Sequence, residues 1–331
     1  MIKRIIAILC VVLITIPMTV SCSDNNSSNS SDKISVVCTV FPEYDWIKNI
    51  IGDSDKFDVT LLYDSGADLH NFQPTTDDIV KILNCDLFVY VGGESDAWVD
   101  DTLSTAKNGN MKVIDLMEVL GDKAKEEIVK EGMQAEAEEE ESSEHRETEV
   151  ENDEHVWLSL GNAKLFCSEL ERVFCEIDSE NAEYYRLNNA AYAEKLDKLD
   201  ADYKNAVSKK KYDTLVFADR FPFLYLLSDY GIDYYAAFVG CSAETEASFE
   251  TIAFLANKVD ELGQKAVMVI EGSDQKIAKT VIENTKSKDM KIVEMDSMQS
   301  VTTEKINAGE TYLGAMEKNL TALKKGLGIG E

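Results

Sequence analysis

Residues 34–51, with the sequence ISVVCTVFPEYDWIKNII, contain the pattern that decides the fold. The β-branched run from Ile34 to Val40 indicates a strand, and the segment from Glu43 to Ile51 indicates a helix. Pro42 stands at the start of that helix, where its missing N–H costs nothing. A strand followed at once by a helix is the repeating unit of α/β proteins with parallel sheets.

The same alternation continues on both sides of a long polar segment. Before that segment we expect a helix at Thr76 to Leu83 and strands at Phe57 to Tyr63, Leu87 to Val91 and a stretch ending near Asp115. After it we expect strands at Thr214 to Phe217, Asp233 to Phe238, Ala266 to Ile270 and Lys291 to Met295. The chain is therefore predicted to form two α/β lobes, residues 34–178 and 211–331, that share an architecture without an obvious sequence repeat.

Residues 179–210 between the two lobes predict one long linker helix. Apolar side chains recur at helical spacing, among them Tyr184, Tyr192 and Leu199, and Ser179 is a suitable N-cap. A helix of this length spans roughly 45 Å, enough to join two lobes. A continuous helix bends less than a loop hinge, so we expect small lobe motions rather than wide closure.

The N-terminal residues predict export. Residues 1–21 combine Lys3 and Arg4 with a long apolar run and are typical of a cleaved signal peptide. Cys22 follows, and then a polar Ser/Asn-rich tether to residue 33. This junction resembles the lipobox of bacterial lipoproteins, although Thr19 replaces the usual leucine. We expect Cys22 to carry a lipid anchor, and the alternative is a plain secretory signal.

Charge and cysteine content exclude several classes of function. The formal net charge of −29 argues against nucleic acid as a partner and favours a cationic ligand. Without Cys10 and Cys22 five cysteines remain, an odd number that does not suggest a disulfide framework. The stretch Glu136 to Glu154 has eleven acids and one base. We expect a disordered acidic insertion at about residues 131–154.

Three histidines are the most informative residues. His70 follows the second predicted strand, His145 lies in the acidic insertion, and His155 lies at its downstream edge. Ligands of parallel sheets bind beyond the carboxyl ends of strands, and Asp296 follows the last strand. Taken singly, each histidine is also consistent with a capping or surface role. Imidazoles and a carboxylate meeting in the cleft between the lobes would suit zinc or manganese.

The segments around His70 and His155 resemble the solute-binding proteins of zinc and manganese ABC transporters. Residues 66–77, GADLHNFQPTTD, are similar to the family motif Gly-x-Asp-Pro-His-x-Tyr-Glu-Pro-x-x-x-Asp, which carries the first ligand. Residues 153–158, DEHVWL, are similar to Asp-Pro-His-x-Trp-Leu, which carries the second. The resemblance extends over essentially all of the mature chain.

The third ligand departs from that family pattern. Where the relatives carry a histidine or a glutamate this chain has Arg220, whose guanidinium stays protonated and cannot bind a metal. Either Arg220 turns away to pair with an acid such as Asp219 or Glu271, or the loop after the next strand supplies the donor. Glu244 is the favoured donor of that loop and Cys241 the other. An equally good interpretation makes Glu244 a helix-capping acid.

The resemblance implies a fourth ligand and a function. Met295-Asp296-Ser297 is similar to the turn that carries the aspartate of the manganese relatives, so Asp296 joins His70 and His155 in the expected site. We expect a monomeric receptor, not an enzyme, that holds zinc, or alternatively manganese, outside the cytoplasm and delivers it to an ABC permease. Two alternatives are a zinc hydrolase with an open position near Arg220 and a surface adhesion protein with a structural metal.

Overall fold

The computed structural model describes residues 33–66, 69–106, 108–134, 151–242 and 246–330. The predictions for the signal peptide, the anchor at Cys22, the donor Glu244 and residues 135–150 of the acidic insertion lie outside these residues. In the part of the chain that the structure describes, no helix is both long and apolar enough for a membrane span.

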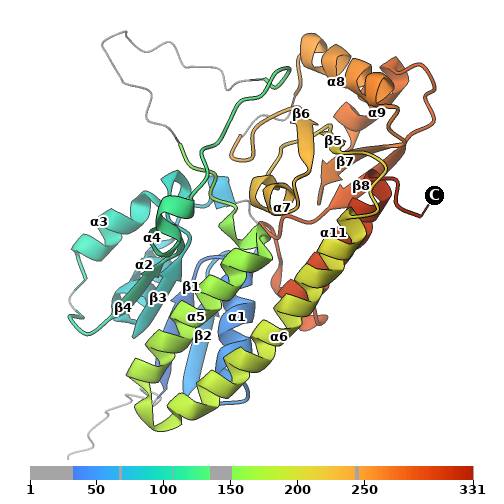
Figure 1. Cartoon of the computed structure of the whole chain (residues 1–331). Coiled ribbons are helices and arrows are strands. Elements are labelled where there is room, and N and C mark those ends of the chain that lie inside the picture. Colours follow the sequence, from blue (N-terminus) through green and yellow to red (C-terminus); the bar gives the residue numbers. More distant parts are fainter. Residues whose placement is uncertain (1–32, 67–68, 107, 135–150, 243–245, 331) are drawn as a thin grey trace, which may run out of the picture. The chain divides into compact units, whose positions relative to one another are not determined.

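The first lobe is built on a parallel sheet in the order β2-β1-β3-β4 (Figure 1). Its strands are β1 (Ile34–Cys38), β2 (Phe57–Leu61), β3 (Leu87–Tyr90) and β4 (Lys112–Asp115). Its helices are α1 (Phe41–Ile51), α2 (Thr76–Asn84), α3 (Trp98–Ser104), α4 (Leu116–Leu120) and α5 (Leu160–Ile177). Short 3-10 turns are η1 (Leu69–Asn71), η2 (Glu94–Asp96), η3 (Gly121–Lys123) and η4 (Val156–Leu158).

The second lobe repeats this arrangement in the order β6-β5-β7-β8, again with parallel pairing. Its strands are β5 (Thr214–Phe217), β6 (Asp233–Ala236), β7 (Ala266–Ile270) and β8 (Lys291–Met295). Its helices are α7 (Leu224–Asp229), α8 (Phe249–Leu262), α9 (Lys276–Asn284), α10 (Thr303–Asn307) and α11 (Tyr312–Gly326). The predicted fold class, two α/β lobes with parallel sheets, is confirmed.

Helix α6 (Ala182–Val207) runs between the two sets of elements, as Figure 1 shows. Its first half packs on α1 and α5, and Tyr192 donates a hydrogen bond to the Asp45 carboxylate at 3.2 Å. Its second half packs on α11, where Tyr203 donates to the carbonyl oxygen of Met316 at 2.6 Å. The same helix is therefore attached to both lobes by buried contacts.

One hydrophobic core also extends through both lobes. It includes Val36 and Phe88 of the first sheet and Leu215 and Met268 of the second. The ring of Trp46 in α1 meets the ring of Tyr312 in α11 edge-on, with 5.2 Å between the centroids. Each Å² of apolar surface removed from water contributes about 25 cal/mol of stability. A core shared by both lobes therefore holds them together strongly.

The structure corrects two boundaries. The linker helix begins at Ala182 with Asn181 as N-cap, since Ser179 instead starts the 3-10 turn η5 (Ser179–Asn181). The second boundary is the end of the predicted acidic insertion, where residues 151–154 make defined contacts. Asn152 pairs with Glu126 in an isolated bridge, and Asp153 and Glu154 are both buried and each accepts a hydrogen bond.

Candidate metal centre

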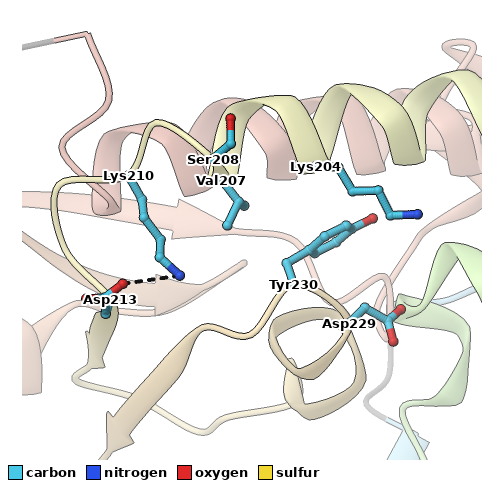
Figure 2. Close-up of a pocket in the computed structure, with 7 residues that line it drawn as sticks. All are labelled: Lys204, Val207, Ser208, Lys210, Asp213, Asp229 and Tyr230. Carbon is cyan, nitrogen blue, oxygen red and sulfur yellow. Dashed lines mark ion pairs between the residues drawn. The ribbon is translucent and has the colours of Figure 1, made fainter.

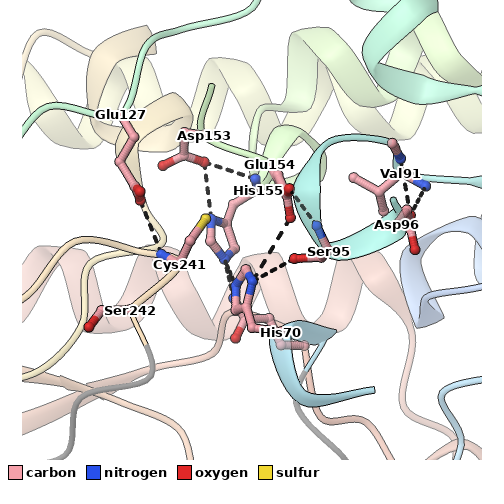
Figure 3. A network of polar contacts seen from close by, with 12 residues as sticks. His70, Val91, Ser95, Asp96, Glu127, Asp153, Glu154, His155, Cys241 and Ser242 are labelled. Atoms are coloured by element: carbon pink, nitrogen blue, oxygen red, sulfur yellow. Dashed lines mark hydrogen bonds and ion pairs between the residues drawn. The ribbon is translucent and has the colours of Figure 1, made fainter. Parts of the chain in front are cut away.

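His70 lies on η1, in the segment that follows β2 (Figure 3). Leu69 beside it is buried, which fixes the turn on the lobe. The Nδ1 atom of His70 is 2.7 Å from the hydroxyl of Ser95 and 3.9 Å from a carboxylate oxygen of Glu154. With Nδ1 held in this way, Nε2 is the nitrogen that remains for a metal.

His155 immediately precedes η4 and is fully buried. One carboxylate oxygen of Asp153 accepts from the His155 backbone N–H at 2.8 Å and lies 3.0 Å from Nδ1. A carboxylate can only accept, so Nδ1 donates and Nε2 keeps its lone pair. Trp157, two residues on, donates to the carbonyl oxygen of Ser297 at 2.8 Å and so attaches this turn to the second lobe.

The two imidazoles converge on one point. Their Nε2 atoms are 3.4 Å apart, and the ring planes meet at 61°. Two nitrogens bound to one tetrahedral zinc, each about 2.0–2.1 Å from it, are separated by about 3.4 Å. The structure thus brings His70 and His155 to the spacing that one zinc ion requires.

Cys241 is the third possible donor at this point. Its Sγ and one ring nitrogen of each histidine lie within 4.8 Å of one another, the one such group of three found among the described residues. The cysteine lies in the loop after β6, and its backbone N–H donates to Glu127 at 3.0 Å. Gly240 has no room for a side chain, because a Cβ there would be 3.0 Å from the ring of His155.

Carboxylates surround the three donors (Figure 3). Burial alone would lower the pKa of His155, but Asp153, Glu154 and Glu127 outweigh burial and raise it. Burial raises the pKa of Glu154 and of Cys241, and for Cys241 the charge of Glu127 adds to the rise. A cation between the imidazoles would offset the mutual repulsion of these acids, so the field favours a cationic ligand.

The other predicted site residues lie differently. Asp296 is not in the group of converging donors, and one of its carboxylate oxygens accepts from the backbone N–H of Met298 at 2.8 Å. Arg220 donates through Nη1 to the carbonyl oxygen of Ser242 at 3.2 Å. Glu271 accepts from the backbone N–H of Ser297 at 2.7 Å and also from its hydroxyl. Arg220 therefore makes a loop contact where the family pattern has a ligand.

Sequence reasoning missed Gln299 and Ser95. Gln299 is buried in the loop after β8, and its side-chain nitrogen contacts Nε2 of His155. It stands three residues after Asp296, in the segment that the family resemblance had pointed to. Ser95 belongs to η2, which directly follows Gly92 and Gly93, and this pair of glycines is the sequence feature that could have indicated a close approach here. At Gly93, with φ +83°, a Cβ would collide with Glu154.

A hollow of about 510 Å³ over α6 and α7 is separate from the histidines (Figure 2). Its lining residues are Lys204, Val207, Ser208, Lys210, Asp213, Asp229 and Tyr230. Its charges largely pair locally, since Lys210 lies 3.2 Å from Asp213 and Lys204 2.6 Å from Asp200. The chemistry therefore points to the histidines and not to this hollow.

Comparisons with known proteins agree with the geometry. The chain is 29% identical over 299 residues to the zinc-binding protein AdcA of Streptococcus pyogenes, covering 88% of this chain and 56% of that protein. It is 28% identical over 313 residues to the high-affinity zinc uptake system protein ZnuA of Bacillus subtilis, covering 93% and 92%. This chain thus spans little more than half the length of the streptococcal relative.

A solved structure and a family match complete the comparison. The Zn(II)-bound ZnuA-like domain of Streptococcus pneumoniae AdcA has a TM-score of 0.69 at 29% identity, covering 89% of this chain and 99% of that domain. Residues 36–326 match the family described as ZnuA, zinc-uptake complex component A, periplasmic. The match takes in both lobes and both histidines, and the chain belongs to this zinc-uptake component A family.

Proposed function

We propose that this protein captures a divalent transition metal outside the cytoplasm, with zinc as the principal cargo, and passes it to an ABC permease. The observation that carries the proposal is the pair of Nε2 atoms 3.4 Å apart, each on a ring whose Nδ1 is held by a neighbour. Two imidazoles held in this way are typical of a metal site.

Family membership and relatives support zinc as the cargo and binding without turnover. The relatives are described as zinc-binding and zinc-uptake proteins. The proposal includes a lipid anchor at Cys22, a monomeric receptor and a membrane permease as partner. It retains His70 and His155 as ligands, with manganese as the alternative cargo, and it leaves Asp296 to a test by substitution.

The test is metal titration of the purified protein, together with zinc import by cells at limiting supply. His70→Ala and His155→Ala are expected to abolish high-affinity zinc binding and import. The matched control is His145→Ala, a change in the acidic insertion that should alter neither. Normal zinc import by the His155→Ala protein would refute the proposal.

Two measurements separate the receptor from its rivals. A zinc hydrolase would turn over ester, peptide or phosphate substrates when loaded with zinc, and we expect no turnover. An adhesion protein with a structural metal would unfold when a chelator strips the ion. Buried apolar side chains link the two lobes in the core, so we expect the stripped protein to stay folded and keep its far-ultraviolet circular dichroism spectrum.

A further inference from the structure

The loop that carries Cys241 is held from two sides. On one side the Cys241 backbone N–H donates to the Glu127 carboxylate at 3.0 Å. On the other side Arg220 donates to the carbonyl oxygen of Ser242 at 3.2 Å. Both contacts act on the backbone next to the thiol, and Sγ lies within 4.8 Å of one ring nitrogen of each histidine.

The loop also packs directly on the ligand His155. A Cβ on Gly240 would lie 2.9 Å from the carbonyl oxygen of Phe221 and 3.0 Å from the imidazole of His155. Only glycine allows this approach, and the next residue along the chain is Cys241. The loop is therefore placed so that the cysteine, rather than a more distant residue, faces the converging nitrogens.

The separation of the donors fits a thiolate ligand. All three donor atoms lie within 4.8 Å of one another. In a tetrahedral zinc site, with Zn–S about 2.3 Å and Zn–N about 2.0–2.1 Å, sulfur and nitrogen are about 3.6 Å apart. The carboxylates of Glu127, Asp153 and Glu154 also lie around these donors, so the field at this point favours a cation. A cation would satisfy these acids and the sulfur together.

We propose that Cys241 supplies a thiolate as the third ligand beside His70 and His155, and that this donor makes the site take zinc and other thiophilic divalent cations in preference to manganese. The inference rests on the proposed function and deepens it. As the sulfur–metal bond forms, the thiol proton passes to solvent. Arg220 is a positioning residue that holds the loop through Ser242.

The selectivity follows from the match between ligand and ion. Thiolate favours zinc and softer ions such as cadmium, whereas manganese prefers carboxylate, carbonyl and water oxygens. Arg220 stands where the family pattern has a histidine or a glutamate, so the oxygen donor of the manganese-type pattern is absent at that point. A sulfur donor beside two imidazoles favours zinc over manganese.

The decisive experiment uses Co²⁺ as a spectroscopic probe in the purified protein. Co²⁺ bound by a thiolate gives a charge-transfer band in the near ultraviolet, in addition to visible bands. We expect this band in the parent protein and its loss in Cys241→Ser, with visible bands retained. Cys175→Ser is the matched control, because Cys175 is a half-buried thiol on α5 that donates to the carbonyl oxygen of Ala182 and does not belong to the group of converging donors.

Affinity measurements give the second readout. Cys241→Ser should lose more zinc affinity than the roughly 10- to 100-fold that removal of an outer-shell partner costs, while its manganese affinity changes little. Arg220→Lys keeps the positive charge but loses the planar guanidinium that donates to Ser242. This variant should weaken zinc binding without removing the charge-transfer band.

The outcomes separate this inference from the proposed function. Visible Co²⁺ bands without a charge-transfer band in the parent protein would overturn the thiolate ligand and leave the two-histidine receptor intact. A ratio of zinc to manganese affinity unchanged by Cys241→Ser would also overturn it. Failure of the parent protein to bind Co²⁺ or zinc would overturn the proposed function itself.

Discussion

The loops that follow β2 and β6 occupy the same place in their two sheets, since each comes after the strand that begins the order. One loop leads to His70 and the other to Cys241. The histidine is held through its side chain, by Ser95, whereas the cysteine is held through its backbone, by Glu127. The same topology thus places a donor at equivalent points, and different contacts fix each donor there.

The difference has a physical reason. An imidazole has a second nitrogen, so a neighbour can orient the ring without occupying the donor atom. A thiol has only its sulfur, so the contacts that can position Cys241 without using the donor atom are contacts to the backbone. Glu127 and Arg220 make such contacts on the two sides of the thiol. The variants below break or sharpen this contrast, beginning with the largest expected effect.

Removal of an imidazole should have the largest effect. His155→Ala deletes a donor and leaves the buried Asp153 carboxylate without its ring partner. We expect zinc affinity to fall by more than the roughly 100-fold upper range for an outer-shell change. Competition against a chromophoric chelator measures the loss. A fall of less than tenfold would show that His155 is not a ligand.

Removal of the Asp153 carboxylate, which orients the His155 ring, should cause the next largest loss of zinc affinity. Asp153→Asn keeps the shape but can present an amide N–H to Nδ1 of His155, which favours the wrong tautomer. We expect about 10- to 100-fold weaker zinc binding. Ser95→Ala is the companion at His70, where Glu154 also lies 3.9 Å away, and its effect should be smaller. Equal losses in the two variants would contradict the assigned roles.

The backbone contact of the second loop should matter less. Glu127→Ala removes the acceptor of the Cys241 N–H, and hydrogen bonds to charged groups contribute about 1.5–3 kcal/mol. Only part of this free energy reaches the metal, so we expect zinc binding to weaken about tenfold or less. Glu127→Gln keeps an acceptor oxygen and should rescue most of the loss. No rescue by glutamine would indicate that charge, and not position, is what Glu127 provides.

Asp296→Asn should have the smallest effect on zinc affinity. Its carboxylate accepts from the N–H of Met298, and the asparagine oxygen can do the same. We expect less than a threefold change, a difference of about 0.7 kcal/mol or below. The same titration as for His155→Ala measures it. A loss as great as that of His155→Ala would place Asp296 in the loaded site and require the second lobe to rearrange on binding.

The first lobe should also show a pH dependence of stability. Burial raises the pKa of Glu43 from 4.5 to about 8, although Thr39 and Val40 donate to the carboxylate. The folded protein therefore binds the proton more tightly than the unfolded chain, and the free energy of unfolding falls as pH rises from about 4.5 to 8.

Glu43→Gln stays uncharged and keeps an acceptor for Thr39, so its stability should decline less over this range. Denaturant unfolding of the metal-free protein at several pH values measures the slope. Glu180→Gln, at an exposed position, is the control and should keep the parent slope. Identical slopes in the Glu43→Gln and parent proteins would rule out this carboxyl group as the cause.

The fold was largely predictable from local pattern. Three second-lobe strands, such as Ala266–Ile270, have the expected ends, because buried parallel strands are short apolar runs bounded by polar residues. Asp153 and Glu154 were assigned to a disordered segment because composition counts their charges. It does not reveal that His155 and Ser95 donate to them.

The site was only partly predictable. His70 and His155 lie in recognisable motifs, and the structure brings their rings together as expected. Whether they bind a metal stays a prediction. The position of Cys241 depends on Gly240 packing against a ring 85 residues earlier in the chain, and no local periodicity reports such a contact. For the same reason, no sequence pattern pointed to the contact of Gln299 with His155.

Helix α6 is one continuous helix of 26 residues that is hydrogen-bonded to both lobes. Such a rod is about 39 Å long, and a tilt of about 3° moves its far end by about 2 Å. That displacement equals the length of a zinc–nitrogen bond. A bend of the helix too slight to alter the outline of the molecule would therefore be enough to separate Cys241 from His70 and His155 and release the ion.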